Sequence, residues 1–104
     1  MIEVRNSKIH GKGVFALKDF KIGETVVTNM VITFSKENLN DSIIKYCYRW
    51  KDNDVCIFIG EGVFINSSKK PNVKVYLDFD SKIARFIAIN PIKEGDELFY
   101  NYYF

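Results

Sequence analysis

Residues 62–72 read GVFINSSKKPN, a run of polar side chains enclosed between two apolar stretches. Asn66 directly follows three apolar residues, so we expect its side chain to be partly buried. A buried amide needs hydrogen-bond partners, which come either from the backbone or from a ligand. An ordinary surface loop has the same composition, so the interpretation of this segment depends on the sequence around it.

The flanking sequence has the composition of short β-strands. Runs rich in Val, Ile, Phe and Tyr are separated by Gly, Asn, Asp and Pro, a pattern typical of strands joined by turns. Residues 73–79 and 83–89 predict a hairpin. One short helix is predicted to begin at Asn40 or Asp41 and to run to about Tyr48. The other predicted strands are 2–5, 14–17, 25–34, 55–59 and 97–100.

Two turns share one pattern. Residues 20–24 and 92–96 each read apolar residue, lysine, any residue, glycine, acid, and each precedes a predicted strand. Glycine with a positive φ lets the chain turn sharply at such a place. The repetition therefore predicts two similarly built turns in a β-rich fold and carries no catalytic meaning.

The segment before the first of these turns, residues 10–16, reads HGKGVFA. It lacks the third glycine and the following helix of a dinucleotide fingerprint, which excludes a Rossmann interpretation. Glycines allow backbone groups to approach a ligand closely. A binding loop and a plain tight turn are equally compatible with these residues.

The last segment, residues 95–104, reads GDELFYNYYF and has five aromatic residues in its last six positions. Strand alternation places Tyr100 and Tyr102 on one face, and Phe99, Asn101 and Tyr103 on the other. Two phenols on one face could line a narrow slot. An aromatic core or an association surface is the plainer alternative.

Composition predicts one globular domain, residues 1–104, with 47% hydrophobic residues. A net charge of +2 without a basic block argues against direct nucleic-acid binding. Two cysteines and one histidine are too few for a four-ligand zinc site, so no metal is expected. We found neither a signal-peptide run nor an apolar stretch of membrane-spanning length, and expect a reduced, intracellular setting without membrane contact.

In this order, the three segments resemble the SET-domain protein-lysine methyltransferases, in particular the small free-standing bacterial and viral members. GKGVFA with KDFKIGETV is similar to the opening GxG motif and first turn of that family. The 46–50 stretch YCYRW resembles an aromatic stretch of its small members. FINSSKKPN is similar to the motif FxNHSxxPN, and IAINPIKEGDELFYNY to the closing stretch with GEELxxDY. The resemblance covers nearly the whole chain.

The resemblance implies a mainly β fold, the β-clip or SET fold, with several short sheets, one short helix and a C-terminal pseudoknot past the 66–72 loop. It implies S-adenosylmethionine as cofactor and a lysine ε-amine of a protein or peptide as methyl acceptor. The implied cofactor-binding residues are Lys12, Gly13 and Val14 through their backbone, Tyr46, Asn66, and Ser67 beside the adenine. Tyr102 is implied as the catalytic tyrosine, and Tyr100 matches the position where tyrosine accompanies monomethylation.

The chemistry needs alignment more than a general base, because methyl transfer to an amine is an in-line displacement. Neutralising a lysine of pKa near 10.4 at pH 7 costs about 4.6 kcal/mol. An apolar channel and an adjacent sulfonium both disfavour the ammonium form. A missing His, Cys or Asp base therefore does not count against an enzyme.

Three positions depart from the family pattern. Ser67 replaces a histidine, Asn101 replaces an acid, and Tyr103 replaces a glycine. The chain ends two residues after Tyr102, so we expect the wall of the lysine channel to come from Tyr103 and Phe104, from a second subunit or from the substrate. A homodimer is the expectation that we favour.

Two other classes stay open at this point. One is a catalytically inactive SET-like domain that binds a peptide or cofactor, and the other is an antifreeze-like β-clip binding module. The substrate is equally open among histone, chromatin and ribosomal proteins. The expected location is the cytoplasm, or the host nucleus if the chain is viral.

Overall fold

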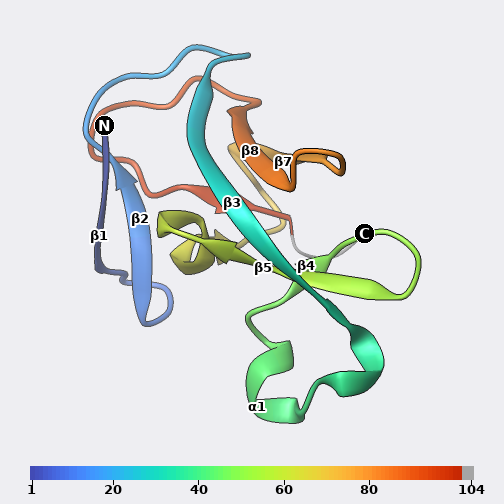
Figure 1. The fold of residues 1–104 in the computed structure, drawn as a ribbon. Helices are drawn as coiled ribbons and strands as arrows, with labels where there is room; N and C mark the ends of the chain where they lie inside the picture. The colour runs from blue at the N-terminus through green and yellow to red at the C-terminus, as the bar shows by residue number, and fades with distance from the viewer. Residues whose placement is uncertain (102–104) are drawn as a thin grey trace.

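The fold consists of three small sheets, and the computed structural model describes residues 1–101 of the chain (Figure 1). An N-terminal hairpin joins β1 (Ile2–Asn6) to β2 (Lys12–Ala16). The largest sheet has five antiparallel strands in the order β4-β5-β3-β8-β7. Its members are β3 (Thr25–Ser35), β4 (Tyr48–Arg49), β5 (Asp54–Ile59), β7 (Val73–Asp78) and β8 (Ile83–Ala88).

The third sheet is a two-residue parallel pair, β6 (Asn66–Ser67) with β9 (Phe99–Tyr100). The helical elements are short: α1 (Asp41–Ile44) and the 3-10 helices η1 (Lys36–Asn38) and η2 (Glu61–Phe64). No helix among residues 1–101 has the length and apolar character needed to cross a bilayer. The expected mainly β fold with one short α-helix is confirmed.

The five-stranded sheet curls so that its two edge strands approach each other. Trp50, directly after β4, packs edge-on against Phe79, directly after β7, with ring centroids 4.9 Å apart. The inner face of the sheet carries the core, in which Phe86 and Cys56 are fully buried and Phe58 nearly so. The edges therefore meet at one end of the curl, around Trp50 and Phe79.

The C-terminal segment lies between the N-terminal hairpin and the 66–72 loop. On one side, Leu98 N donates to Val14 O at 2.7 Å, and Ala16 N donates to Asp96 O at 2.9 Å. On the other side, Ser68 N donates to Tyr100 O at 2.9 Å. This insertion between two segments far apart in sequence is the C-terminal pseudoknot, and it brings all three sequence motifs together.

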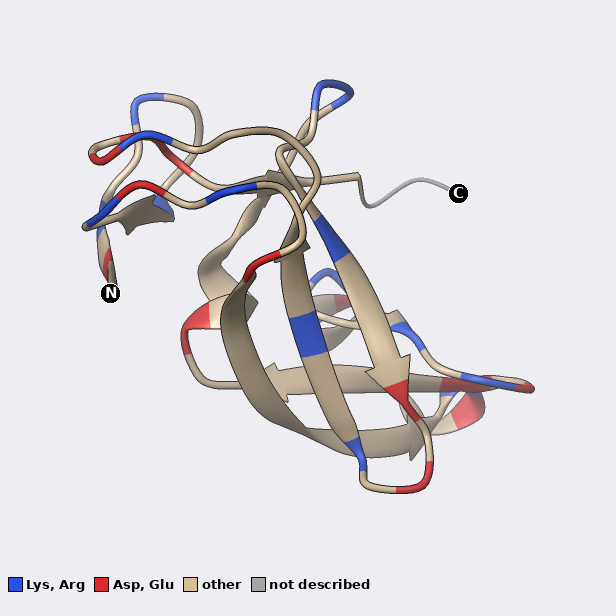
Figure 2. Cartoon of the chain, turned by 90° about the horizontal axis from the view of Figure 1, so that it is seen from above, with Lys and Arg blue, Asp and Glu red and all other residues tan. Residues whose placement is uncertain are grey.

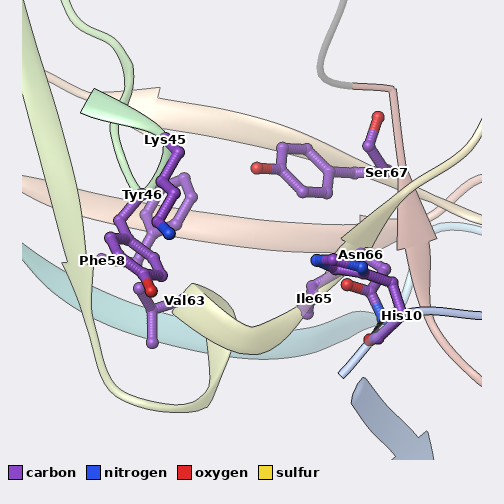
Figure 3. A pocket seen from close by; sticks show the side chains of 9 residues that line it. His10, Lys45, Tyr46, Phe58, Val63, Ile65, Asn66 and Ser67 are labelled. Atoms are coloured by element: carbon purple, nitrogen blue, oxygen red, sulfur yellow. Dashed lines mark hydrogen bonds between the residues drawn. The ribbon is translucent and has the colours of Figure 1, made fainter. Parts of the chain in front are cut away.

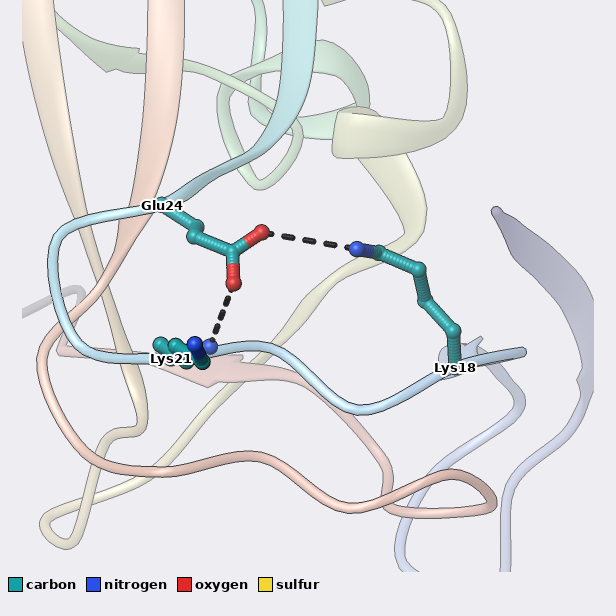
Figure 4. A network of polar contacts seen from close by, with 3 residues as sticks. All are labelled: Lys18, Lys21 and Glu24. Atoms are coloured by element: carbon teal, nitrogen blue, oxygen red, sulfur yellow. Dashed lines mark hydrogen bonds and ion pairs between the residues drawn. The ribbon is translucent and has the colours of Figure 1, made fainter.

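The two repeated turns have the same structure. Gly23 and Gly95 have φ values of 92° and 93°, which favour glycine. In the first turn, Lys21 N donates to Glu24 Oε1 at 2.9 Å, while Lys18 Nζ lies 3.4 Å from the other carboxylate oxygen (Figure 4). The Lys21 backbone N–H, assisted by the Lys18 charge, lowers the pKa of Glu24. The acid thus closes the turn, as its position after the glycine suggests.

The second turn repeats this closure with an aspartate. Lys93 N donates to Asp96 Oδ2 at 2.9 Å. The two turns also bond each other, because Phe20 and Ile92 exchange backbone hydrogen bonds of 2.8 and 3.0 Å. The predicted architectural role of the repeat is confirmed.

The predicted helix end was wrong. The helix was expected to reach about Tyr48 but ends at Ile44, because Tyr48 and Arg49 pair with Cys56 and Val55 as strand β4. Its start was right, since Asn40 caps it by accepting from Ser42 N and Ile43 N. The strand predicted over 97–100 is confined to Phe99–Tyr100, and Glu97 forms an isolated bridge with Phe15.

Candidate functional site

A cavity of about 450 Å³ opens between η2, β6 and the chain that follows α1 (Figure 3). We call it the first cavity. Figure 3 shows Lys45, Tyr46 and Phe58 on one of its sides, and His10, Asn66 and Ser67 on the other. Its complete lining is His10, Lys45, Tyr46, Phe58, Val63, Ile65, Asn66, Ser67 and Tyr100. An annex of about 240 Å³ shares four of these residues and adds Gly11, Lys12 and Phe64.

Asn66 ties the three sequence motifs together at the wall of this cavity. Its Nδ2 donates to His10 O at 3.1 Å, to Lys12 O at 3.0 Å and to Glu97 Oε2 at 2.9 Å. All side-chain hydrogen bonds that Asn66 makes within residues 1–101 run through this nitrogen. The amide oxygen is therefore left as an acceptor for a ligand, and Asn66 is partly buried as expected.

Glu97 completes this junction from the C-terminal segment. Ser7 Oγ lies 2.8 and 3.0 Å from its two carboxylate oxygens. The carboxylate also lies so close to Gly13 that a Cβ added there would meet Glu97 Oε2. Gly13 is thus required by space, since its φ is not in the left-handed region. The second glycine of the GxG motif makes room for an acid that holds Asn66.

Strand β3 positions the floor of the cavity through Asn29. This asparagine is 5% exposed and accepts from Gly62 N at 2.8 Å, while its Nδ2 donates to Thr28 O at 3.0 Å. Gly62 opens the segment GVFIN, so the bond fixes η2 and, directly after it, Ile65 and Asn66. Nothing in the sequence distinguished Asn29 from an ordinary strand residue.

Tyr100 stands between the first cavity and another one. The residue is 7% exposed, and its ring centroid lies 5.8 Å from that of Tyr48, 6.0 Å from that of Phe86 and 6.5 Å from that of Phe58. The second cavity, of about 240 Å³, is lined by Tyr48, Pro71, Val73, Lys74, Val75, Ile89, Tyr100 and Asn101. A single buried phenol therefore contacts both spaces.

The charge of the first cavity is positive. Lys45 lines it, with Nζ 5.2 Å from the centroid of the Tyr46 ring, and His10 lies across from them. Among the described lining residues there is no carboxylate. A ligand with a negatively charged end fits this wall best. No group of three or more His, Cys, Asp and Glu gathers in the described part of the chain as it would around a metal ion.

The candidate residues from the sequence fall into three groups. Tyr46, Asn66, Ser67 and Tyr100 line the first cavity, and Lys12 lines its annex. Gly13 and Val14 line neither space within the described structure; Val14 is fully buried, and its carbonyl accepts from Leu98 N. Tyr102 lies outside the described residues.

Besides Asn29, sequence reasoning missed four further residues at the site. Lys45 and Tyr48 lie within two residues of Tyr46 in the chain, but only the early end of α1 shows that they face the two cavities. His10 was noted as part of the glycine segment without a role. Glu97 could have been suspected from the sequence. Asp96, directly after the turn glycine, closes the turn, so the second acid, Glu97, has no part in it and must have another role.

The chain is similar to proteins with one shared domain. The SET domain profile matches residues 11–103. A Schizosaccharomyces pombe histone-lysine N-methyltransferase, named as specific for H3 lysine-37, is 26% identical across 97% of this chain and 72% of its own length. The histone-lysine N-methyltransferase trithorax of Drosophila virilis is 33% identical across 99% of this chain, which spans only 3% of that protein.

Solved structures share the fold. The crystal structure of a Plasmodium falciparum protein, named as a candidate histone methyltransferase, is 25% identical and has a TM-score of 0.84, over 98% of this chain and 92% of that one. Chaetomium thermophilum Polycomb Repressive Complex 2, at 22% identity and a TM-score of 0.80, matches 98% of this chain with 15% of its own. Since the profile match runs from the first glycine of the GxG motif almost to the C-terminus, this chain belongs to the SET-domain family.

Proposed function

We propose that this protein is an S-adenosylmethionine-dependent protein-lysine N-methyltransferase. Its relatives at 26–33% identity are named histone-lysine N-methyltransferases. The observation that carries the proposal is the position of Tyr100 between a polar, positively charged cavity and a second cavity whose wall includes the rings of Tyr48 and Tyr100. A transferase needs two such spaces, one for the donor and one for the acceptor, that meet at one point. Family membership favours this function over an antifreeze-like module.

The first cavity fits S-adenosylmethionine in size and chemistry. Its volume of about 450 Å³ lies within the range of roughly 300–1,000 Å³ usual for small-molecule sites. Lys45 would pair with the methionine carboxylate beside Tyr46, and Asn66 Oδ1 would accept from the amine. Ser67 would meet the adenine through its backbone. The cofactor, when bound, supplies a methyl group activated by a positive sulfur.

The backbone of Lys12, Gly13 and Val14 remains the proposed neighbour of the methionine end. Lys12 is the best placed of the three, because it lines the annex and its carbonyl already holds Asn66. Gly13 and Val14 would act by fixing that carbonyl, through the contact with Glu97 and the bond to Leu98.

The second cavity would admit the substrate lysine. The rings of Tyr48 and Tyr100 form part of its wall. Aromatic faces attract the ammonium at the mouth of such a channel, and exclusion of water inside it then favours the neutral amine. The chain's contribution is therefore to orient the amine and to let its proton leave to solvent. Tyr102 is the proposed catalytic tyrosine.

Tyr100 is proposed to limit the reaction to one methyl group. Its hydroxyl occupies space next to the acceptor, so a second methyl on the nitrogen would be crowded. Replacing Tyr100 by Phe removes that oxygen and should allow dimethyllysine to form. Mass spectrometry of the modified lysine distinguishes the two products.

The test is transfer of labelled methyl groups into a mixed protein extract. Wild type should label lysine, while Tyr102→Phe should fall sharply. Asn66→Ala should lose cofactor binding in calorimetry. The control Asn90→Ala, which removes an exposed hydrogen bond from the side-chain amide to Pro71 O, should keep it. Equal labelling by wild type and Tyr102→Phe would refute the role of that tyrosine. Cofactor binding by the wild type without any transfer would favour the catalytically inactive alternative.

A further inference from the structure

The second cavity lies at the open end of the seam between the two edges of the curled sheet. Tyr48 belongs to β4, and residues 73–75 belong to β7, the two edge strands. The seam is closed at its other end by the contact of Trp50 with Phe79. A polypeptide that presents a side chain to Tyr100 through this cavity would pass the start of β7 and Pro71 of the loop before it, since these residues form part of the cavity wall.

That surface carries an excess of positive charge. Lys74 is the one charged residue among the described lining of the second cavity. The loop that contributes Pro71 also carries Lys69 and Lys70, both exposed. In Figure 2 this loop is a narrow blue-tipped hairpin that leads into β7, which itself begins with a blue band.

Among residues 1–101, these three lysines have no carboxylate partner within ion-pair distance. The ion pairs within residues 1–101 join Arg5 to Glu3 and Lys18 to Glu24, and neither involves the 69–74 segment. Lys74 Nζ lies 5.5 Å from the centroid of the Tyr76 ring, on the exposed side of β7. Three cations beside the second cavity, without an ion pair to any described carboxylate, are therefore available to a partner.

We propose that the substrate of this protein presents its target lysine within an acidic segment. The inference rests on the proposed function, because it assigns the second cavity to the acceptor lysine. Opposite charges across an interface steer association and select partners, whereas like charges facing each other are costly. Aspartate or glutamate beside the target lysine would meet Lys69, Lys70 and Lys74, and a segment rich in arginine and lysine would be repelled there.

The test compares two peptides of equal length, each with one central lysine, flanked by glutamates in one and by arginines in the other. Fluorescence anisotropy should show the acidic peptide binding about tenfold tighter at 0.1 M salt. The difference should shrink at 1 M salt, because the Debye length falls from about 10 to about 3 Å. Methyl transfer, measured in parallel, should follow the same order.

Charge reversal distinguishes the effect of these three lysines on peptide preference from the effect of the net charge of the chain. The triple variant Lys69→Glu, Lys70→Glu, Lys74→Glu should prefer the arginine-flanked peptide. A control with Lys21→Glu, Lys36→Glu and Lys93→Glu has the same net charge and exposed positions elsewhere, and it should keep the wild-type preference.

The outcomes for the two proposals can be told apart. Acidic-peptide binding that responds to the 69–74 variant, without methyl transfer, supports an acidic partner at this surface and counts against both the proposed activity and the assignment of that partner as substrate. Equal or better binding of the arginine-flanked peptide by wild type overturns the inference, even if that peptide is methylated. A preference that the control triple abolishes as fully as the 69–74 triple also overturns it.

Discussion

Gly13 shows how one missing side chain supports the site. The Glu97 carboxylate occupies the place of a Cβ at this position, while holding Asn66 and Ser7. Gly13→Ala should therefore displace the carboxylate and lower the free energy of unfolding by about 1–3 kcal/mol, as overpacking does. Urea denaturation measures the loss. Ser7→Ala removes the hydroxyl that donates to Glu97 and accepts from Ile9 N and His10 N, but it crowds nothing and should cost less. An equal cost in both variants would contradict the steric argument.

Cys56 gives a pH dependence with a defined sign. Burial, with a smaller contribution from Cys47, raises the pKa of the Cys56 thiol to about 12. Because the pKa of this thiol is higher in the folded state than in the unfolded state, where it is near 9, its contribution to the free energy of unfolding is fully present below pH 9. That contribution is lost as the pH rises from 9 toward 12. Native protein at pH 8 should react with a disulfide reagent only as fast as it opens. Rapid stoichiometric labelling of Cys56 without denaturant would disprove this.

The residues of the site could be predicted only where a motif marked them. Asn66, Ser67 and Tyr100 stand in recognisable strings, and the structure gathers them around one cavity. Lys45 and Tyr48 could not be assigned, because their directions depend on the residue at which α1 ends. Tertiary pairing sets that end, since Tyr48 gains a partner in β5 that a longer helix would forfeit.

The parallel pair of β6 with β9 depends on Asn72 as much as on the two strands. Asn72 Nδ2 donates to Glu97 O and its Oδ1 accepts from Phe99 N, at 2.9 and 2.8 Å. Asn72→Asp replaces the donor by an oxygen facing a carbonyl, so unfolding should become easier by about 1–3 kcal/mol. Asn90→Asp, the control, loses one exposed bond and should change stability little. Similar midpoints in urea for both variants would contradict this role.

The α1 cap links an exposed turn to the first cavity. Asn40 Oδ1 accepts from Ser42 N and Ile43 N at 3.1 and 3.2 Å. Loss of such a cap costs about 1 kcal/mol, which should fall on the local order of α1 and the Lys45–Tyr46 wall. Asn40→Ala should therefore weaken S-adenosylmethionine binding severalfold in calorimetry while leaving the global urea midpoint nearly unchanged. Unchanged affinity would show that the wall forms independently of the cap.

Among the elements, the longer strands could be predicted and the shortest could not. Alternating Val, Ile and Phe marked β3, β5, β7 and β8 within one or two residues of their ends. β6 consists of an asparagine and a serine, which have low strand propensity. Its pairing with β9 spans more than thirty residues, and only the resemblance to a threaded fold predicted it.

The whole molecule is organised around two interlocked copies of one turn. Gly23 N donates to Ala88 O and Ala88 N to Glu24 O, while Gly95 N donates to Ala16 O and Ala16 N to Asp96 O. Each turn is thus hydrogen-bonded to the strand that leads into the other one. The N-terminal and C-terminal motifs are held together by this exchange, which explains why a site built from both ends of the chain can be stable in a small domain.

The homodimer expected from the sequence remains a prediction, and the outer face of the five-stranded sheet offers it a surface. Met30, Ile32 and Ile59 are 71%, 50% and 47% exposed there, and β3 and β5 are directly paired. One partner of a standard interface buries about 800 Å².

A second copy of the chain is therefore the predicted occupant of this face. Light scattering at micromolar concentrations should give about twice the monomer mass of 12.1 kDa. Ile32→Lys places a charge at the centre of the face and should yield monomer, because an unpaired charge is costly to bury. Ile22→Lys, at an exposed isoleucine in the 20–24 turn, should remain dimeric. A monomeric wild type, or dissociation by both variants alike, would leave the sheet face without this role.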